Sequence, residues 1–323
     1  MLISVIAFVL VVAGAGAEAQ QPTKIPRIGF YLDASASVVA TRIEGFRQGL
    51  RELGYIEGKN IIIEWRSADG NPERRSEIAA ELVRLKVDLI VSGGPTGTRA
   101  LRETTSTIPI VMGQDTDPVG SGFVVSLARP GGNITGLSAL APEMSGKQLA
   151  LMKEILPKLS RVAVIGNSTN PGDAQALRET VLAAGSFEIY LRYLDVLDPK
   201  DIENVFRAVV KGRADAILLL GNPVLNTHRK QIADLAGKHR LPASYARPEY
   251  VEAGGLMYYG TNYPELFRRA ATYVDKILKG GKPGELPVEQ PTKFEFMINL
   301  KAARQIGLAI PPNVLARADR VIR

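Results

Sequence analysis

The sequence has no cysteine, two histidines and one tryptophan among its 323 residues. Without cysteine the chain forms no disulfide, no thiolate metal site and no cysteine nucleophile, and it offers no cysteine for a lipid anchor. The histidines, His228 and His239, fall on one predicted helix three turns apart, and no third metal ligand accompanies them. We interpret both as surface residues, and we expect neither a metal nor a cofactor.

Motifs of the common enzyme classes are also missing. The sequence contains no G-x-G-x-x-G dinucleotide fingerprint, no Walker phosphate-binding loop and no G-x-S-x-G nucleophile elbow. The chain therefore lacks the usual residues for cofactor or nucleophile chemistry. These absences predict a binding protein rather than an enzyme.

The formal net charge is +7, but the basic residues do not gather in one stretch. Along the predicted helices they alternate with acids, as between Arg42 and Glu52, and no basic run with interleaved aromatic side chains occurs. We therefore expect no nucleic-acid partner. A hydrophobic content of 46% over 323 residues is typical of a soluble globular protein with about two domains.

Residues 1–19 differ from the rest of the chain. Leu2 to Val12 is nearly all apolar, and Ala17-Glu18-Ala19 fits the small-x-small pattern that a signal peptidase cleaves. The pattern predicts a signal peptide cleaved near Ala19 and a periplasmic protein. No Lys or Arg precedes the apolar run, which leaves the export route open. An N-terminal anchor helix or a buried strand is the alternative interpretation.

One strand-turn-helix pattern occurs twice in the chain. The first copy begins with the apolar run Asp88-Leu89-Ile90-Val91, typical of a buried parallel strand, and continues with the turn Ser92-Gly93-Gly94-Pro95. The second copy runs from Asp215 to Pro223. Small turn residues let a ligand approach the backbone, and the next helix begins with N–H groups that lack an intrahelical partner. The repeat predicts two similar lobes whose strand ends face a shared cleft.

Strands and helices alternate along the rest of the chain. In the first half we expect strands at residues 26–32, 60–65, 88–91, 109–112 and 134–137, with helices between them and a short helix from Val119 to Ala128. In the second half we expect strands at residues 161–166, 187–194, 242–246, 255–259 and 294–299, and one that starts at Asp215. The longer helices expected there run from Leu225 to His239 and from Tyr263 to Leu278. The alternation predicts an α/β fold with open parallel sheets.

Polar and aromatic side chains follow the predicted strands at their carboxyl ends, where ligands bind in open parallel sheets. The candidate ligand-binding residues are Asp33, Ser35, Ser92, Gly94, Thr96, Thr116, Asp117, Asn167, Asn170, Asn222, Tyr245 and Tyr259. Ser92 and Thr96, with the free N–H groups around Gly94, can hold a carboxylate, and Asp117 or Asp33 can hold an ammonium group. The alternative for each polar residue is a turn former or helix cap. The tyrosines are compatible with stacking on an aromatic amino acid or with packing.

Several longer stretches resemble a known family. They are GFRQGLRELGYIEGKNIIIEWRSADG at 45–70, TDPVGSGFVVSLARPGGNITGLS at 116–138, RVAVIGNSTNP at 161–171, GGLMYYGTNY at 254–263, and residues 289–322, which begin EQPTKFEFMINL. Together they are similar to the ABC-transporter substrate-binding protein family that includes tryptophan-binding members. The resemblance covers residues 21–323. It implies a type I periplasmic-binding-protein fold, in which two Rossmann-like lobes are joined by three crossings of the chain and close on a ligand.

The resemblance also implies how this chain is divided and what it binds. It assigns residues 24–137 and 261–283 to lobe one, and residues 138–260 and 284–323 to lobe two. The strand-end candidates up to Asp117 then face those from Asn167 to Tyr245 across the cleft. The implied function is that of a monomer that captures a small polar solute, an amino acid or a related carboxylate. The permease subunits of an ABC uptake transporter would recognise its closed form.

Two other functions fit the same residues. A periplasmic ligand-sensing module would present its closed form to a receptor instead of a permease. A sugar- or nucleoside-processing enzyme would use the same Rossmann-like scaffold for small-molecule chemistry. The sequence alone does not separate transport from sensing, and it leaves the identity of the ligand open.

Overall fold

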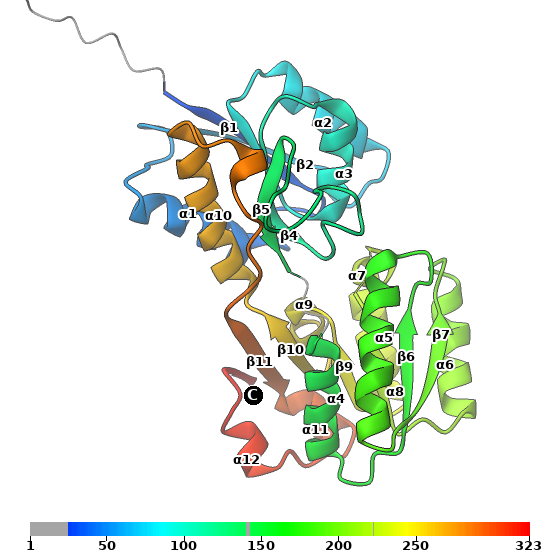
Figure 1. The fold of residues 1–323 in the computed structure, drawn as a ribbon. Coiled ribbons are helices and arrows are strands. Elements are labelled where there is room, and N and C mark those ends of the chain that lie inside the picture. Colours follow the sequence, from blue (N-terminus) through cyan, green and yellow to red (C-terminus); the bar gives the residue numbers. More distant parts are fainter. Residues whose placement is uncertain (1–24, 140–142, 222) are drawn as a thin grey trace, which may run out of the picture.

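The computed structural model describes residues 25–139, 143–221 and 223–323. Two β-sheets organise this part of the chain into two lobes, one above the other in Figure 1. The predicted signal peptide and Asn222 lie outside the described residues. Within the described ranges, no helix combines the length and the apolar character that crossing a membrane requires.

The first sheet is parallel throughout. It contains, in spatial order, β2 (Ile62–Ser67), β1 (Arg27–Leu32), β3 (Leu89–Ser92), β4 (Ile110–Asp115) and β5 (Ile134–Ser138). Every residue of β3 and β4 is buried, which is consistent with the apolar runs at 89–91 and 110–112 within them. The helices of this lobe are α1 (Ala40–Glu52), α2 (Arg74–Arg84), α3 (Pro95–Thr104) and α10 (Tyr263–Leu278), the last of which returns from far along the chain.

Helix α10 packs directly against α1 because α1 carries glycine at the contact. A Cβ atom at Gly45 would lie 2.3 Å from the backbone oxygen of Pro264, and one at Gly49 would lie 2.2 Å from that of Arg268. Only residues without a side chain let the two helix backbones approach so closely. The contact anchors α10 to the first lobe.

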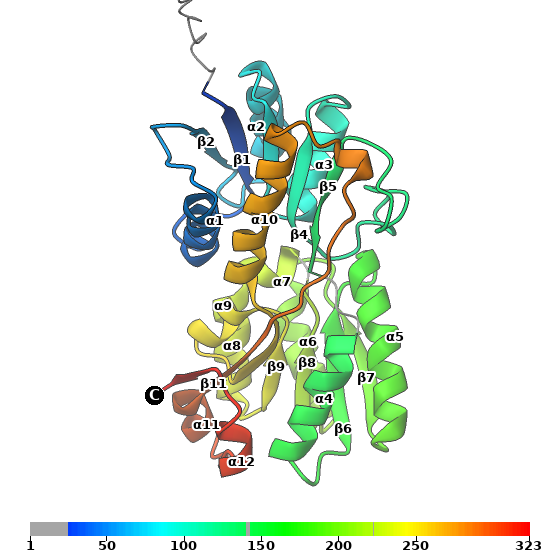
Figure 2. The same ribbon diagram turned by 60° about the vertical axis from the view of Figure 1, so that its left-hand side comes forward.

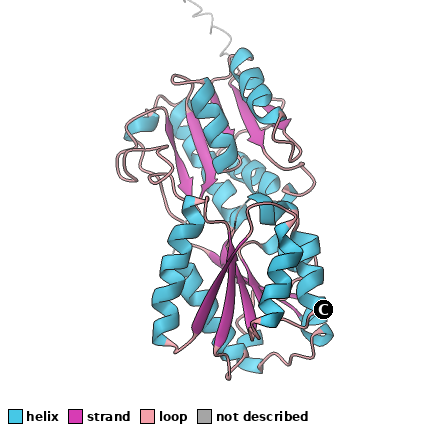
Figure 3. Cartoon of the chain, turned by 90° about the vertical axis from the view of Figure 1, so that its right-hand side faces the viewer, coloured by secondary structure: helices cyan, strands magenta, loops and turns pink. Residues whose placement is uncertain are grey.

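The second sheet is larger. It contains, in spatial order, β12 (Arg320–Ile322), β11 (Phe294–Asn299), β10 (Met257–Thr261), β9 (Ala243–Tyr245), β8 (Ala216–Leu219), β6 (Arg161–Gly166) and β7 (Tyr190–Asp195). Its strands are parallel except for β10 and β11, which pair antiparallel. Helices cover both of its faces (Figure 3). The predicted α/β class, with two lobes built on parallel sheets, is confirmed.

The helices of the second lobe vary in length. They are α4 (Glu143–Ile155), α5 (Pro171–Ser186), α6 (Asp201–Lys211), α7 (Pro223–Thr227), α8 (Arg229–Lys238), α9 (Pro248–Glu252), α11 (Leu300–Gln305) and α12 (Pro312–Leu315), with a 3₁₀ turn, η1 (Pro283–Glu285), before β11. Helix α5 has no counterpart among the predicted helices. Its start nevertheless has a common helix-capping residue, because the side chain of Asn170 accepts a hydrogen bond from the N–H of Gly172.

Two predicted helices differ from the structure. The prediction of a short helix from Val119 to Ala128 is wrong, since these residues form turns and bends. Gly122 takes a φ of 69° there, which interrupts helical geometry. The helix predicted from Leu225 to His239 is divided into α7 and α8 at His228, and this histidine lines an interlobe cavity instead of the outer surface.

Within the described residues the chain passes between the lobes at 261–263 and 289–294, and a third passage joins Ala139 to Glu143. Thr261 Oγ1 donates to the carbonyl of Ala139 at 3.3 Å, and the N–H of Asn262 donates to the carbonyl of Lys293 at 3.1 Å. The crossings are therefore hydrogen-bonded to one another. Before the last crossing, residues 284–289 run beside β5 (Figure 2), so this segment, expected in lobe two, contacts the first lobe.

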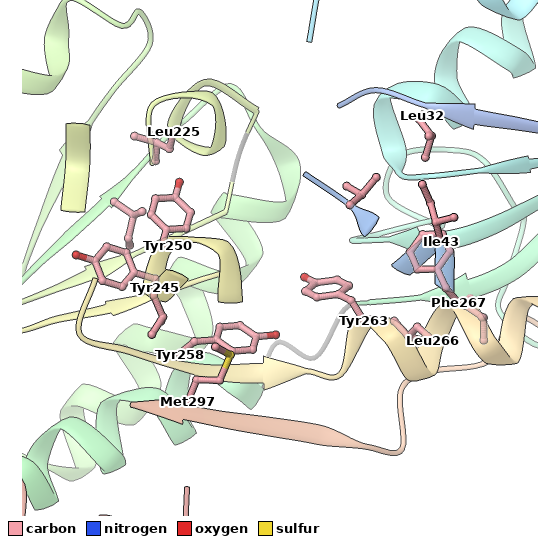
Figure 4. Packing of buried hydrophobic residues seen from close by; sticks show 14 of the residues in the cluster. Leu32, Ile43, Leu225, Tyr245, Tyr250, Tyr258, Tyr263, Leu266, Phe267 and Met297 are labelled. Carbon is pink, nitrogen blue, oxygen red and sulfur yellow. The ribbon is translucent and has the colours of Figure 1, made fainter. Parts of the chain in front are cut away.

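Buried side chains form a continuous apolar core through the region where the lobes meet (Figure 4). Tyr263, at the start of α10, lies between Leu266 and Phe267 of the first lobe and Tyr258 of the second. The hydroxyl of Tyr258 donates to the carbonyl of Thr261 at 2.7 Å, so this buried ring has a polar partner in the crossing segment. The core thus joins both lobes at the base of the space between them.

Candidate ligand-binding site

A cavity of about 860 Å³ lies between the two lobes. The first-lobe residues that line it include those following β1, β3 and β4, and the second-lobe residues include those following β6, β8 and β9. The carboxyl ends of strands from both sheets therefore face one space, as in other open parallel sheets that bind ligands. The volume falls within the range of small-molecule sites, about 300–1,000 Å³.

Most of the candidate residues from the strand ends line this cavity. They are Asp33, Ser35, Gly94, Thr96, Thr116, Asp117, Asn167 and Asn170. The amide oxygens of the two asparagines already serve local structure, since Asn167 Oδ1 accepts from the N–H of Thr169 at 2.9 Å and Asn170 caps α5. The structure brings these residues together, and their contact with a ligand stays a prediction.

The turn between β3 and α3 presents bare backbone to the cavity. Residues 93–96 all line it, and Gly94 has a φ of 157°, which residues with a side chain rarely adopt. The N–H groups of Thr96 and Gly97, in the first turn of α3, have no acceptor within the helix. A helix N-terminus of this kind can accept an anion such as a carboxylate.

Ser92 lies beneath this turn and not in the cavity. It is fully buried, and its hydroxyl donates to the carbonyl of Gly94 at 2.9 Å and lies 2.8 Å from Thr98 Oγ1. Gln114 Nε2 donates to the carbonyl of Gly93 at 2.7 Å from the other side. These bonds fix the shape of the turn, so the structure places Ser92 as a support for the backbone that lines the cavity.

Three further candidates are not among the lining residues. Tyr245 is buried and stacks on Tyr250 with ring centroids 5.0 Å apart, and it is Tyr250 that lines the cavity. Tyr259 packs against Phe294 and Phe296 of β11, with ring centroids 6.3 and 6.1 Å away. The third, Asn222, lies outside the described residues.

The two candidate aspartates of the first lobe differ in their partners. Arg75 Nε donates to Asp33 Oδ1 at 2.9 Å, so an ion pair already neutralises Asp33. Asp117 Oδ1 accepts a hydrogen bond from the N–H of Gly120 at 2.8 Å, and within the described ranges it has no ion pair. Asp117 is therefore the more available partner for an ammonium group.

The cavity also contains a charged cluster that the strand-end pattern did not predict. Arg42 of α1 forms an ion pair with Glu249 of α9, across the two lobes. Arg247, directly before α9, reaches Gln114 of β4, with 3.5 Å between Nη1 and Oε1. Arg229 begins α8, and all of these residues line the cavity.

The charges of this cluster shift one another's pKa. Burial alone raises the pKa of the Glu249 carboxyl, but Arg42 and Arg247 beside it hold that pKa below its usual value. Burial lowers the pKa of Arg42, and Glu249 opposes this effect. Glu249 is therefore ionised at neutral pH. Its Oε2 atom is buried without a hydrogen-bond donor among the described residues.

Some of these residues carried a signal in the sequence. Arg247 directly follows the predicted strand at 242–246, so the strand-end rule could have included it. Arg42 lies four residues before Phe46 on the apolar face of its helix, where a charge is unusual. Glu249 carries no such signal, because an acid in the first turn of a helix is ordinary.

The fold and the cavity define a two-lobed solute-binding protein with the type I periplasmic-binding architecture. Comparison with known families gives the same result. Residues 34–322 match the family described as ABC transporter substrate binding protein. The chain belongs to this family, and it is the solute-binding component of an ABC transporter.

Individual relatives resemble the chain over most of its length. A tyrosine-binding protein of Clostridioides difficile (strain R20291) is 26% identical over 259 residues, which span 79% of this chain and 73% of that protein. The crystal structure of a conserved domain protein from Vibrio cholerae is 32% identical, with a TM-score of 0.83 and coverage of 92% of this chain and 100% of the other. A domain from Streptococcus pneumonia in complex with L-Trp is 24% identical, with a TM-score of 0.83 and coverage of 92% and 99%.

Proposed function

We propose that the protein captures an amino acid or a related carboxylate in the interlobe cavity. The observation that carries the proposal is the cavity itself, in which the turn at Gly94 and the carboxylate of Asp117 lie on one wall. Asp117 accepts one backbone hydrogen bond and has no ion pair among the described residues. A helix N-terminus suits a carboxylate, and Asp117 suits an ammonium group. The tyrosine-binding and L-Trp-bound relatives support an amino acid as the class of ligand.

Binding is proposed to close the two lobes about the crossings at residues 139–143, 261–263 and 289–294. A ligand that touches both walls stabilises the closed form by its differential affinity for that form. The division into residues 24–137 with 261–283 and residues 138–260 with 284–323 is part of this proposal, except at residues 284–289. Residues 284–289 are expected to move with the first lobe, because they hydrogen-bond to β5 and the loop before it.

The proposed setting is outside the cytoplasm. Substrate-binding proteins of ABC transporters present their ligand to permease subunits there, and the apolar segment at residues 1–19 is proposed to direct export to the periplasm. In this setting a monomer in its closed form is recognised by the permease. No step of capture or delivery requires covalent chemistry.

A thermal-shift screen of the mature protein, beginning at Gln20, tests the proposal. The panel contains L-amino acids, organic acids and sugars, and each amino acid is paired with its carboxamide, which lacks the carboxylate. A ligand present at about 100 times its dissociation constant should add about 2.7 kcal/mol to the free energy of unfolding. Stabilisation by sugars alone, or equal stabilisation by acid and amide, would contradict the proposal.

A further inference from the structure

Positive charge exceeds negative charge where the lobes meet around Glu249. The side chains of Arg42, Arg229 and Arg247 all act on this one carboxylate, which lowers its pKa. Only Arg42 forms an ion pair with it. The cluster thus holds three guanidinium groups and one carboxylate at the wall of the cavity.

Arg247 and Arg229 have no carboxylate partner among the described residues. The guanidinium of Arg247 lies 5.3 Å from the ring centroid of Tyr263, and its hydrogen bond to Gln114 is long at 3.5 Å. Arg229 Nη1 donates to the carbonyl of Asn226 at 3.2 Å. Both side chains are half-buried and line the cavity, so several of their N–H donors are available to a bound molecule.

The positions of these arginines do not serve helix stability. Arg229 is the first residue of α8, whose first turn contains no acid, and Arg247 directly precedes α9. A helix N-terminus carries partial positive charge, so a cation there is unfavourable. The first turns of the two helices supply one acid, Glu249 of α9, and it already forms an ion pair with Arg42. A further anion would remove the remaining repulsion.

On the first-lobe wall of the cavity, most acidic side chains are paired with basic ones. Arg75 pairs with Asp33 there, and Arg74 pairs with Asp69 at 3.2 Å. Among the described residues, the acids of that wall therefore have their own cations, apart from Asp117. The excess of half-buried positive charge belongs to the second-lobe side of the cavity.

We propose that Arg247 and Arg229 form an anion-binding subsite, and that the transported solute carries a second anionic group that occupies it. The inference rests on the proposed function, since the first carboxylate is taken to bind the turn at Gly94. The solute class is then an acidic amino acid or another dicarboxylate. A planar guanidinium binds a carboxylate through two parallel hydrogen bonds, and two of them from neighbouring helix starts can hold one such group.

The test compares ligands that differ only in the second charge. Isothermal titration calorimetry of the mature protein measures L-glutamate against L-glutamine, and succinate against succinamate, at low and high ionic strength. The acid of each pair is expected to bind at least about tenfold more tightly than its amide, because a charge-assisted hydrogen bond contributes more than a neutral one. This ratio is expected to fall as salt is added.

Variants locate the preference. Arg247→Gln, alone and with Arg229→Gln, should reduce the ratio of acid to amide affinity to within about twofold. The ratio compares two ligands on the same variant, so it isolates the second charge from any general effect of the substitution on binding. Arg247→Lys keeps the positive charge but cannot form the two parallel hydrogen bonds of a guanidinium, so it should give an intermediate ratio. Arg207→Gln is the control, because it removes one positive charge from an exposed position on α6 and should leave the ratio unchanged. Melting temperatures confirm that each variant is folded.

The outcomes separate the two proposals. If neutral amino acids bind and their acidic counterparts bind no more tightly, the proposed function stands and the second anionic subsite is wrong. If the preference for the acid survives in the Arg247→Gln, Arg229→Gln double variant, this subsite is also wrong. If no amino acid or carboxylate binds the protein without substitutions, the proposed function fails, and the inference fails with it.

Discussion

Arg42 on α1 and Glu249 on α9 form an ion pair that joins the two lobes beside the cavity. Their side chains are 7% and 15% exposed, so water screens the pair little. Within the described residues this pair and the contact between Arg247 and Gln114 link the lobes through polar side chains that line the cavity. Changes to either partner should therefore affect both the stability and the spacing of the lobes.

Substitution of Glu249 should reduce stability more than substitution of Arg42. Glu249→Gln leaves Arg42 and Arg247 beside each other without a carboxylate, and we expect it to lower the free energy of unfolding by about 3 kcal/mol. Arg42→Met leaves Glu249 beside Arg247, so we expect roughly half that loss. Urea denaturation of both variants at neutral pH measures the difference. If Arg42→Met lowers the free energy of unfolding more than Glu249→Gln does, Arg247 does not stabilise the charge of Glu249.

Gly49→Ala should destabilise the first lobe. The new Cβ would lie 2.2 Å from the backbone oxygen of Arg268, so α10 must move away from α1, at a loss of about 1–3 kcal/mol. Gly185→Ala is the matched control, because Gly185 is an exposed position in α5 where a Cβ meets nothing within 4 Å. That change should be neutral or stabilising by up to about 1 kcal/mol. Equal losses in both variants, measured by thermal denaturation, would contradict this explanation.

Asp117→Asn should weaken binding of an amino acid without unfolding the protein. Loss of a hydrogen bond to a charged group removes about 1.5–3 kcal/mol, which corresponds to a loss of affinity of roughly 10- to 100-fold. Asp69→Asn is the control, because Asp69 also lines the cavity but is paired with Arg74. Its affinity should stay within about twofold of the original. Calorimetric titration with a ligand from the screen decides between them, and equal affinities would remove Asp117 from the site.

Asp115 predicts a change of stability with pH. Burial raises the pKa of its carboxyl well above the usual value, and Thr98 Oγ1, 2.9 Å from Oδ2, offsets this only in part. The native state therefore holds this proton more tightly than the unfolded chain does, so its contribution to stability is full below about pH 4 and is lost as the pH rises above that value. Asp115→Asn should raise the denaturation midpoint at pH 7, and the gain should disappear below about pH 4.

Asp215 provides the opposite case for the same experiment. Burial tends to raise the pKa of its carboxyl, but hydrogen bonds from Ser160 and from the N–H of Arg161 bring it below the usual value. Its stabilising contribution is present above the pKa of the unfolded chain, about 3.9, and is lost as the pH falls. Asp215→Asn should therefore reduce stability at pH 7 and have less effect near pH 3. The same sign of change in both variants would contradict the assigned protonation states.

Much of the fold could be predicted from periodicity because buried parallel strands leave a strong local signal. Residues 89–91 are apolar at consecutive positions, and the glycines after Ser92 mark the strand end. The antiparallel pairing of β10 with β11 was not predictable in this way, since strand direction depends on how distant segments meet. Tyr259 illustrates the consequence, because β11 supplies the aromatic rings on which it packs.

The site was predictable where ligand-facing residues follow strands, and less so elsewhere. The turns at Asp33, Gly94 and Asp117 obey the strand-end rule and line the cavity. Arg42 and Glu249 lie on helices, and their proximity results from the packing of the two lobes. A single sequence contains no local pattern for a contact between residues so far apart along the chain.

Helix α10 and residues 284–289 return to the first lobe after most of the second sheet has been completed. Neither half of the molecule is therefore encoded by one uninterrupted stretch, and no single cut in the chain separates one lobe from the other. Autonomous folding of an isolated half is not expected, and heating should melt the protein in one cooperative transition. A ligand that raises the temperature of this transition therefore stabilises the whole molecule, whichever wall of the cavity it contacts first.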